Sequence, residues 1–207
     1  MSDRARYPVP AARHRTEATI ERSRFLCTIA RVSTSEDAQL FVREMNAEFA
    51  DATHNCWAYV IGAPGNTSRI GMSDAGEPHG TAGRPMLTVL LHSGVGDIAA
   101  VVTRYYGGTK LGTGGLVKAY SGAVQLALAT LPRVERIEWI EITVGFSYTS
   151  ITAVRQLLST YEAEVIAEEY GNDVQFLLRV PESQAAALRS ALLDATRGQM
   201  QLRETVE

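Results

Sequence analysis

The chain has 207 residues, enough for one large domain or two small domains that each bury a core. Its composition is that of an ordinary soluble protein, and it has no run of about 18 apolar residues that could span a bilayer. Its first residues lack the apolar stretch of a signal peptide, and two cysteines, Cys27 and Cys56, are too few for a disulfide framework. These features predict a cytoplasmic protein with reduced thiols and no membrane contact.

The net charge of −3 conceals an asymmetry along the chain. Residues 1–137 carry a balance of +3, whereas residues 138–207 carry a balance of −6. A basic part attracts phosphate and an acidic part repels it, so we expect any nucleic acid to bind the first part.

The first part begins with a proline-containing, charged segment that is typical of a flexible arm. Ser33 and Glu36 then match a capping box, and apolar residues at helical spacing follow. In chain order we predict a flexible arm at 1–14, a strand or bent hairpin at 15–32, a helix reaching residue 49, a strand buried on both faces at 56–61, and a short strand at 69–72.

A loop with several charged groups and glycines follows at Ser73–Pro85. Pro85 suits the first position of a helix, and the run from Ile98 to Tyr106 is apolar enough for a central strand. A helix is predicted from Gly114 to Leu131, with one narrow polar strip that faces outward or onto a ligand.

The second part starts after a change of charge and pattern near Pro132 and predicts a separate domain over residues 135–207. Strands and helices alternate there in the order βαββαβ, and Gly171 with Asn172 suits a tight hairpin that needs positive φ. This order predicts a ferredoxin-like domain with both helices on one side of an antiparallel sheet. An RNA-recognition module has the same order, but the third strand lacks its stacking aromatics and the domain is acidic.

The segment Val101–Tyr120 (VVTRYYGGTKLGTGGLVKAY) leads an apolar strand through a glycine-rich turn into a helix. Lys110 and Lys118 are the only lysines of the chain and lie in this segment. A helix start with a glycine loop and a mobile ammonium predicts a site for phosphate or carboxylate. It is not a Walker P-loop, because Thr113 stands where that motif requires lysine. The alternative is a tight strand-to-helix joint that needs glycine only for packing.

Two further groups allow chemical interpretations. Asp74, Glu77 and His79 can converge on a metal or act as an acid and a base, or they can form a capping loop held by Arg84 or Arg104. His54 and Cys56 lie two residues apart and share one face of a strand. We interpret His54 as a buried, hydrogen-bonded side chain rather than a zinc ligand, because two ligands do not make a zinc site and no C-x-x-C pair exists.

Three blocks, THNCWAY, SDAGEPHGTAGRP and VVTRYYGGTKLGTGGLVKAYS, resemble the signature blocks of the Impact (imprinted and ancient) family in its two-domain bacterial form. The resemblance implies an α+β protein of two domains. The first, over residues 15–134, is similar to domain 2 of ribosomal protein S5 and to domain IV of elongation factor G. The second resembles elongation factor G domain V.

Eukaryotic relatives act in translational control, so the resemblance implies a translation-associated binding or regulatory protein. The expected partners are RNA or the ribosome at the first domain and a protein at the second, with no cofactor. The alternative is an enzyme or sensor that binds a small phosphate ligand at the same loop, with Glu77 or Asp74 as base. The expected binding surface comprises His54, Ser73, Asp74, Gly76, Glu77, Gly80, Thr81, Arg84, Arg104, Tyr105, Gly107, Gly108, Lys110, Gly112, Gly114, Gly115, Lys118 and Tyr120.

This chain departs from the family pattern at two positions. Ala75 stands where the family usually has a second aspartate, and His79 stands where it usually has serine. The loss of the aspartate argues against a metal site with two carboxylates, because half of the ligand charge is missing.

Overall fold

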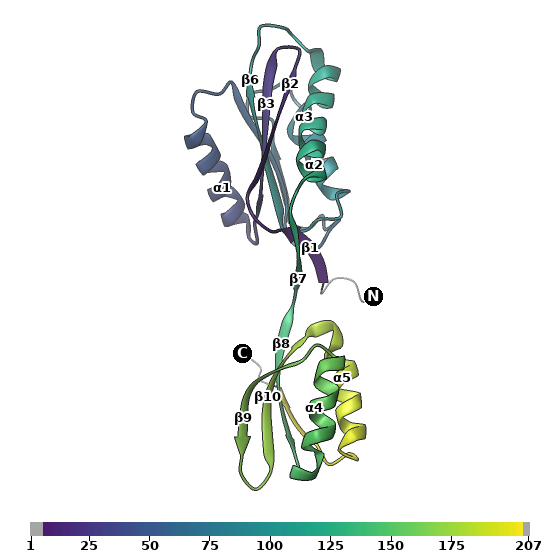
Figure 1. Cartoon of the computed structure of the whole chain (residues 1–207). Coiled ribbons are helices and arrows are strands. Elements are labelled where there is room, and N and C mark those ends of the chain that lie inside the picture. Colours follow the sequence, from purple (N-terminus) through teal and green to yellow (C-terminus); the bar gives the residue numbers. More distant parts are fainter. Residues whose placement is uncertain (1–5, 205–207) are drawn as a thin grey trace. The chain divides into compact units, whose positions relative to one another are not determined.

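A computed structural model describes residues 6–204 of the chain. The described residues form two compact units, which divide between Glu135 and Arg136, with Arg6 grouped with the second. Each unit combines helices with antiparallel strands, which confirms the predicted α+β class with two domains (Figure 1). Within the described residues, the helices are all too short or too polar to cross a membrane.

The N-terminal unit is built on a five-stranded antiparallel sheet with the order β2-β3-β6-β4-β5. Helix α1 covers one face of this sheet, and helices α2 and α3 cover the other (Figure 1). The elements are β2 (His14–Ile20), β3 (Ser23–Arg31), α1 (Ser35–Glu48), β4 (His54–Val60), β5 (Ile70–Ser73), α2 (Gly83–Leu91), β6 (Ile98–Tyr105) and α3 (Gly112–Ala129).

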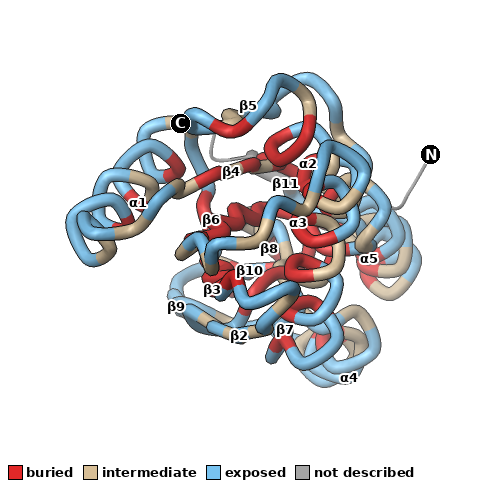
Figure 2. Tube along the Cα trace, turned by 90° about the horizontal axis from the view of Figure 1, so that it is seen from above, coloured by how far each residue is buried: buried red, intermediate tan, exposed pale blue. Residues whose placement is uncertain are grey.

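Strand β6 lies at the centre of the sheet, as its apolar sequence predicts. Its residues from Ile98 to Arg104 are all buried, and Figure 2 shows β4 and β6 as the buried middle of the unit. Ile98, Ala100 and Val102 pack beneath α2 and α3, whereas Ala99 and Val101 pack beneath α1. Burial on both faces therefore accounts for the absence of alternation in this strand.

The helix starts differ from the predicted ones by one or two residues. Helix α1 is capped by Thr34, whose side chain accepts a hydrogen bond from Asp37 N while the Asp37 carboxylate accepts one from Thr34 N. The capping box is thus one residue later than Ser33 and Glu36. Helix α2 begins at Gly83 rather than at Pro85, and α3 begins at Gly112 rather than at Gly114.

The segment predicted as a flexible arm at residues 1–14 contains a strand, β1 (Arg6–Pro10). It pairs with β7 (Arg133–Ile137) in a two-stranded ribbon, a setting that tolerates prolines. Val9 is fully buried, and the Tyr7 hydroxyl donates a hydrogen bond to Asp97 Oδ2 at 3.0 Å. Residues 6–10 are therefore part of the fold, and the start of the predicted arm lies outside the described residues.

The C-terminal unit has the predicted βαββαβ order and an antiparallel sheet with the order β11-β8-β10-β9. Both helices lie on one face of the sheet, which is the ferredoxin-like arrangement (Figure 1). The elements are β8 (Trp139–Phe146), a 3-10 turn (Tyr148–Ser150), α4 (Ile151–Thr160), β9 (Glu164–Tyr170), β10 (Val174–Pro181), α5 (Glu182–Ala195) and β11 (Gln201–Glu204).

In two hairpins the residues with positive φ are not the ones that the sequence predicts. The β9–β10 hairpin turns through residues 171–173, and neither Gly171 nor Asn172 is among the described residues with positive φ. The β2–β3 hairpin instead has positive φ at Glu21 (46°) and Arg22 (67°), although the sequence has no glycine or asparagine there. Two left-handed residues give the type I′ geometry that suits the twist of the strands.

Ala75 is also left-handed, with φ of 44°. A left-handed conformation costs an L-residue with a Cβ about 1–2 kcal/mol, and glycine avoids this cost. We therefore expect Ala75→Gly to leave the free energy of unfolding unchanged or to raise it by up to about 1 kcal/mol, as measured by urea denaturation.

The matched control is Ala47→Gly on the exposed face of α1. It has no such strain to relieve, so it should lower the free energy of unfolding by about 0.5–1 kcal/mol. Equal losses in the two variants would contradict the strain at Ala75.

Candidate functional site

A buried ion pair lies at the end of β6 in the N-terminal unit. Arg104 Nη1 donates a hydrogen bond to Glu77 Oε1 at 2.6 Å, and the two side chains are only 7% and 3% exposed. Glu77 comes from the loop between β5 and α2, which has no regular structure of its own. The pair therefore fastens this loop to the central strand of the sheet.

Aromatic rings and a hydroxyl hold the Arg104 guanidinium in place. Its carbon lies 5.5 Å from the ring centroids of both Phe25 and Tyr106, and Nη2 lies 3.4 Å from Ser23 Oγ. Cation–π contacts of this kind are stronger where water is excluded. The Nε of Arg104 is buried and has no hydrogen-bond partner among the described residues.

Tyr120 of α3 donates to the same carboxylate oxygen of Glu77 as Arg104 does. Its hydroxyl donates a hydrogen bond to Glu77 Oε1 at 2.9 Å, and burial raises the pKa of Tyr120 far above its usual value. The Cys56 thiol lies 3.4 Å from this hydroxyl and donates to the Asp74 carbonyl at 2.8 Å. Burial raises the pKa of Cys56 to about 12, so the thiol stays protonated and acts as a structural donor.

Asp74 caps helix α2 from outside the helix. Its Oδ1 accepts hydrogen bonds from Ala82 N and Gly83 N, and its Oδ2 accepts one from Gly80 N at 2.8 Å. Partial desolvation acts to raise the pKa of Asp74, but these three donors outweigh it and hold the pKa below its usual value. The structure thus favours the capping-loop interpretation of this segment, with Arg104 as its anchor.

His54 on β4 is fixed by the same loop. Its Nδ1 lies 2.8 Å from the Ala75 carbonyl, which can only accept, so Nδ1 carries the proton and Nε2 remains available in the neutral ring. Gly76, with φ of 89°, leaves room for this ring, because a Cβ there would lie 3.2 Å from it. The histidine is half-buried and hydrogen-bonded, but it also faces a hollow.

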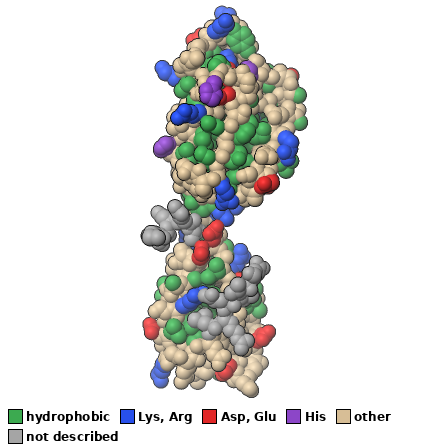
Figure 3. Space-filling model, turned by 180° about the vertical axis from the view of Figure 1, so that it is seen from behind, with side chains coloured by type: hydrophobic (Ala, Val, Ile, Leu, Met, Phe, Trp, Pro, Cys, Tyr) green, Lys and Arg blue, Asp and Glu red, His purple; other side chains and the backbone are tan. Residues whose placement is uncertain are grey.

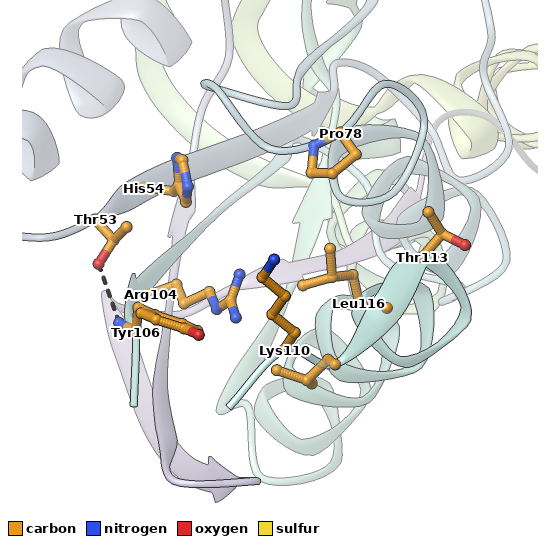
Figure 4. Close-up of a pocket in the computed structure, with 10 residues that line it drawn as sticks. Thr53, His54, Pro78, Arg104, Tyr106, Lys110, Thr113 and Leu116 are labelled. Carbon is orange, nitrogen blue, oxygen red and sulfur yellow. Dashed lines mark hydrogen bonds between the residues drawn. The ribbon is translucent and has the colours of Figure 1, made fainter. Parts of the chain in front are cut away.

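Residues from four segments surround that hollow, which has a volume of about 390 Å³. Figure 4 shows the Lys110 side chain beside Arg104, with His54, Tyr106 and Leu116 around them. The lining residues are Thr53, His54, Pro78, Arg104, Tyr106, Lys110, Leu111, Gly112, Thr113 and Leu116. We call it the first hollow.

A second hollow of about 430 Å³ adjoins the first, since both are lined by Lys110 and Leu111. Lys118 and Gly115 of α3 line it on one side, and Glu21 of the β2–β3 hairpin lines it as well. The two lysines of the chain are therefore on one surface, with Lys110 shared between the hollows.

Gly112 and Thr113 at the start of α3 line the first hollow. Their N–H groups lack intrahelical partners, as at any helix start, and the preceding residue, Leu111, offers no side-chain cap. These groups and the helix dipole favour negative charge, as does Lys110. Figure 3 shows that the basic side chains on one face of this unit are scattered among hydrophobic ones.

Some glycines of the glycine-rich turn are required by close packing, and others have free space around them. Gly107 fits against the β2–β3 hairpin, where a Cβ would lie 2.0 Å from the Arg22 carbonyl oxygen, and its N–H donates to Ser23 Oγ. Gly112 has φ of 70°. By contrast, an added Cβ at Gly108 or Gly114 would meet nothing within 4 Å. Packing therefore explains only some of these glycines.

Several predicted residues do not line either hollow. Tyr105 points to the opposite face of the sheet, where its hydroxyl donates to Asp51 Oδ1 at 2.9 Å. Arg84 is exposed on α2. The remaining supporting residues hold the loop or the network together and are Ser73, Asp74, Gly80, Thr81, Glu77 and Tyr120.

The sequence reasoning missed Ser23, Phe25 and Tyr106. Ser23 and Phe25 lie in the strand or bent hairpin predicted at 15–32, which was given no role at the site, although both contact Arg104. The signal for Tyr106 was available, since an aromatic residue directly precedes the glycine run. Within the described residues, no group of three or more His, Cys, Asp or Glu side chains is placed to hold a metal ion.

Comparison with known proteins identifies the family. Residues 21–128 match the Impact N-terminal domain. This range contains the buried ion pair and every residue that lines the two hollows except Ile20. The chain belongs to the IMPACT family. Residues 144–199 match a domain of unknown function, DUF1949.

Relatives match the chain over most of its length. The chain is 42% identical to the IMPACT family member YigZ of Escherichia coli (strain K12), covering 94% of this chain and 95% of that protein. It is 38% identical to the IMPACT family member YvyE of Bacillus subtilis (strain 168), covering 91% and 86%. A crystal structure described as a hypothetical protein is 41% identical, with a TM-score of 0.67 and 98% of both chains covered.

The buried ion pair gives a stability prediction. Glu77→Ala leaves the Arg104 charge buried without its partner, so we expect the free energy of unfolding to fall by about 3–5 kcal/mol in urea denaturation. The control is Glu17→Ala, which removes the exposed partner of Arg24 and should lower the free energy of unfolding far less. Similar losses in the two variants would contradict a dependence of the fold on the buried pair.

The lowered pKa of Asp74 gives a pH prediction. Asp74→Asn should cost about 1 kcal/mol at neutral pH, because the neutral amide replaces a charged cap that accepts three N–H groups. The difference in the free energy of unfolding between the native protein and the variant should be fully present well above about pH 4. It should shrink as the pH falls through the lowered pKa of Asp74 in the folded protein. Denaturation at several pH values measures it, and a difference that stays constant down to pH 2 would contradict the cap.

Proposed function

We propose that this IMPACT family protein is a translation-associated binding protein that contacts the phosphates of RNA through the two hollows beside Lys110. The observation that carries the proposal is their arrangement. Two adjoining hollows share Lys110 at the uncapped start of α3, and the second adds Lys118. Neighbouring anion sites suit a polymer with phosphates at regular intervals.

The charge balance supports the same partner. The first part of the chain is net positive, whereas the second is strongly acidic and repels phosphate. Because Glu77 neutralises Arg104, the positive potential at the hollows comes from the two lysines and the helix start, and Glu21 partly offsets it at the second hollow. Binding should therefore be modest in affinity and sensitive to salt.

A second candidate function is the binding of a small phosphate-bearing ligand. The size and the largely apolar walls of the first hollow favour it, since small-molecule sites commonly measure about 300–1,000 Å³. A thermal-shift screen with nucleotides separates the two functions. A small ligand that is the natural one binds tightly and raises the melting temperature strongly at low concentration, whereas for a protein whose ligand is longer RNA a single nucleotide binds weakly and gives only a small rise at high concentration.

The lysines give the decisive test of RNA contact. We expect binding of a short single-stranded RNA, followed by fluorescence anisotropy at several KCl concentrations, to weaken as salt rises. Lys110→Gln and Lys118→Gln should each lower the slope of log affinity against log salt by about 0.7, the value for one lost phosphate contact on a single strand.

The matched control is Arg43→Gln, which removes one exposed positive charge on α1, the helix on the opposite face of the sheet. Its slope should equal that of the native protein. If the lysine variants keep the native slope, or if no RNA binds at low salt, the RNA proposal is wrong.

A further inference from the structure

The first hollow offers more than a place for phosphate. Its walls include Leu111, Leu116 and Pro78, and beside them Tyr106, which keeps 46% of its surface exposed. A phosphate group is fully polar and gains nothing from such walls. A planar, weakly polar group attached to the phosphate would gain contact area and stacking on the tyrosine ring.

We propose that the first hollow accepts one unstacked nucleotide, so that the protein selects single-stranded RNA over double-stranded RNA. This inference rests on the proposed function and specifies its substrate class. The phosphate lies at the start of α3 beside Lys110, and the base lies against Tyr106 and the apolar wall. In Figure 4 the Arg104 side chain lies between Tyr106 and Lys110, and Leu116 lies beyond Lys110; all four residues line the hollow.

Arg104 adds a fixed polar part to the wall of the hollow. It lines the hollow although its side chain is only 7% exposed. Glu77 and Ser23 keep the side chain in position, and the Tyr106 ring lies over its guanidinium. The aromatic ring that a base would contact is therefore held in place from behind.

Duplex RNA cannot use these features. Its bases are paired and stacked inside the helix, so it presents phosphates and ribose hydroxyls to a protein. It can contact Lys110 and Lys118 but leaves the apolar wall and the Tyr106 ring uncovered. A single strand can turn one base outward and cover both.

The test compares a short single-stranded RNA with a duplex of the same sequence in anisotropy titrations at one salt concentration. We expect the native protein to bind the single strand more tightly. Tyr106→Ala should weaken single-strand binding by about 5- to 150-fold, the range for loss of one aromatic stacking contact, and should leave duplex binding unchanged.

Tyr106→Phe keeps the ring and should bind as the native protein does. Tyr170→Ala removes an exposed tyrosine of the C-terminal unit as a control and should have no effect. Adenosine monophosphate should also displace the single strand at concentrations where inorganic phosphate, at matched ionic strength, does not.

The outcomes separate this inference from the proposed function. If both RNAs bind equally, with lysine-dependent salt slopes and no loss in Tyr106→Ala, the phosphate contact stands and the nucleotide pocket is wrong. Equal displacement by phosphate and adenosine monophosphate would also overturn the pocket. If neither RNA binds, the proposed function itself fails.

Discussion

The arrangement of the N-terminal unit depends on the buried pair between Arg104 and Glu77. An arginine at the end of a central strand is expensive to bury, and its carboxylate partner comes from a loop with no regular structure. The pair therefore does more than offset its own desolvation, because it fixes where the loop lies. With Glu77 held, Asp74 is placed to cap α2 and the Ala75 carbonyl is placed to orient His54.

This pairing also decides what the site can attract. Arg104 is the most buried basic residue at the first hollow, yet Glu77 neutralises its charge and the rings of Phe25 and Tyr106 cover it. The mobile positive charge is left to Lys110, with the helix start behind it. Lysine differs from arginine in this respect, because its ammonium sits on a flexible stem, whereas the guanidinium of Arg104 is held in place.

Much of the fold could be predicted from the sequence, because the signals are local. The apolar run of β6, the alternation in β8 and the helical spacing of α1 each specify an element without reference to its neighbours. The failures arose where distant residues decide the outcome. Strand β1 is a strand because β7 pairs with it, and α2 starts before Pro85 because Asp74 caps it from the preceding loop.

The candidate site shows the same division. The glycine-rich turn and the two lysines were evident in the sequence, and the structure places both lysines beside one helix start. The alternation of a strand already places Arg104 and Tyr106 on one face and Tyr105 on the other. The sequence could not show that the Phe25 ring also contacts the Arg104 guanidinium, since no spacing rule links residues so far apart.

The glycines of the turn differ in what the fold requires of them. Gly107 must be glycine, because any Cβ would collide with the Arg22 carbonyl. Gly114 has no such neighbour, its φ is not positive, and a glycine inside a helix costs about 0.5–1 kcal/mol relative to alanine. Neither packing nor backbone geometry therefore accounts for it. Gly112, which does line the first hollow, has a φ of 70°, and glycine there avoids the cost that a residue with a Cβ would have.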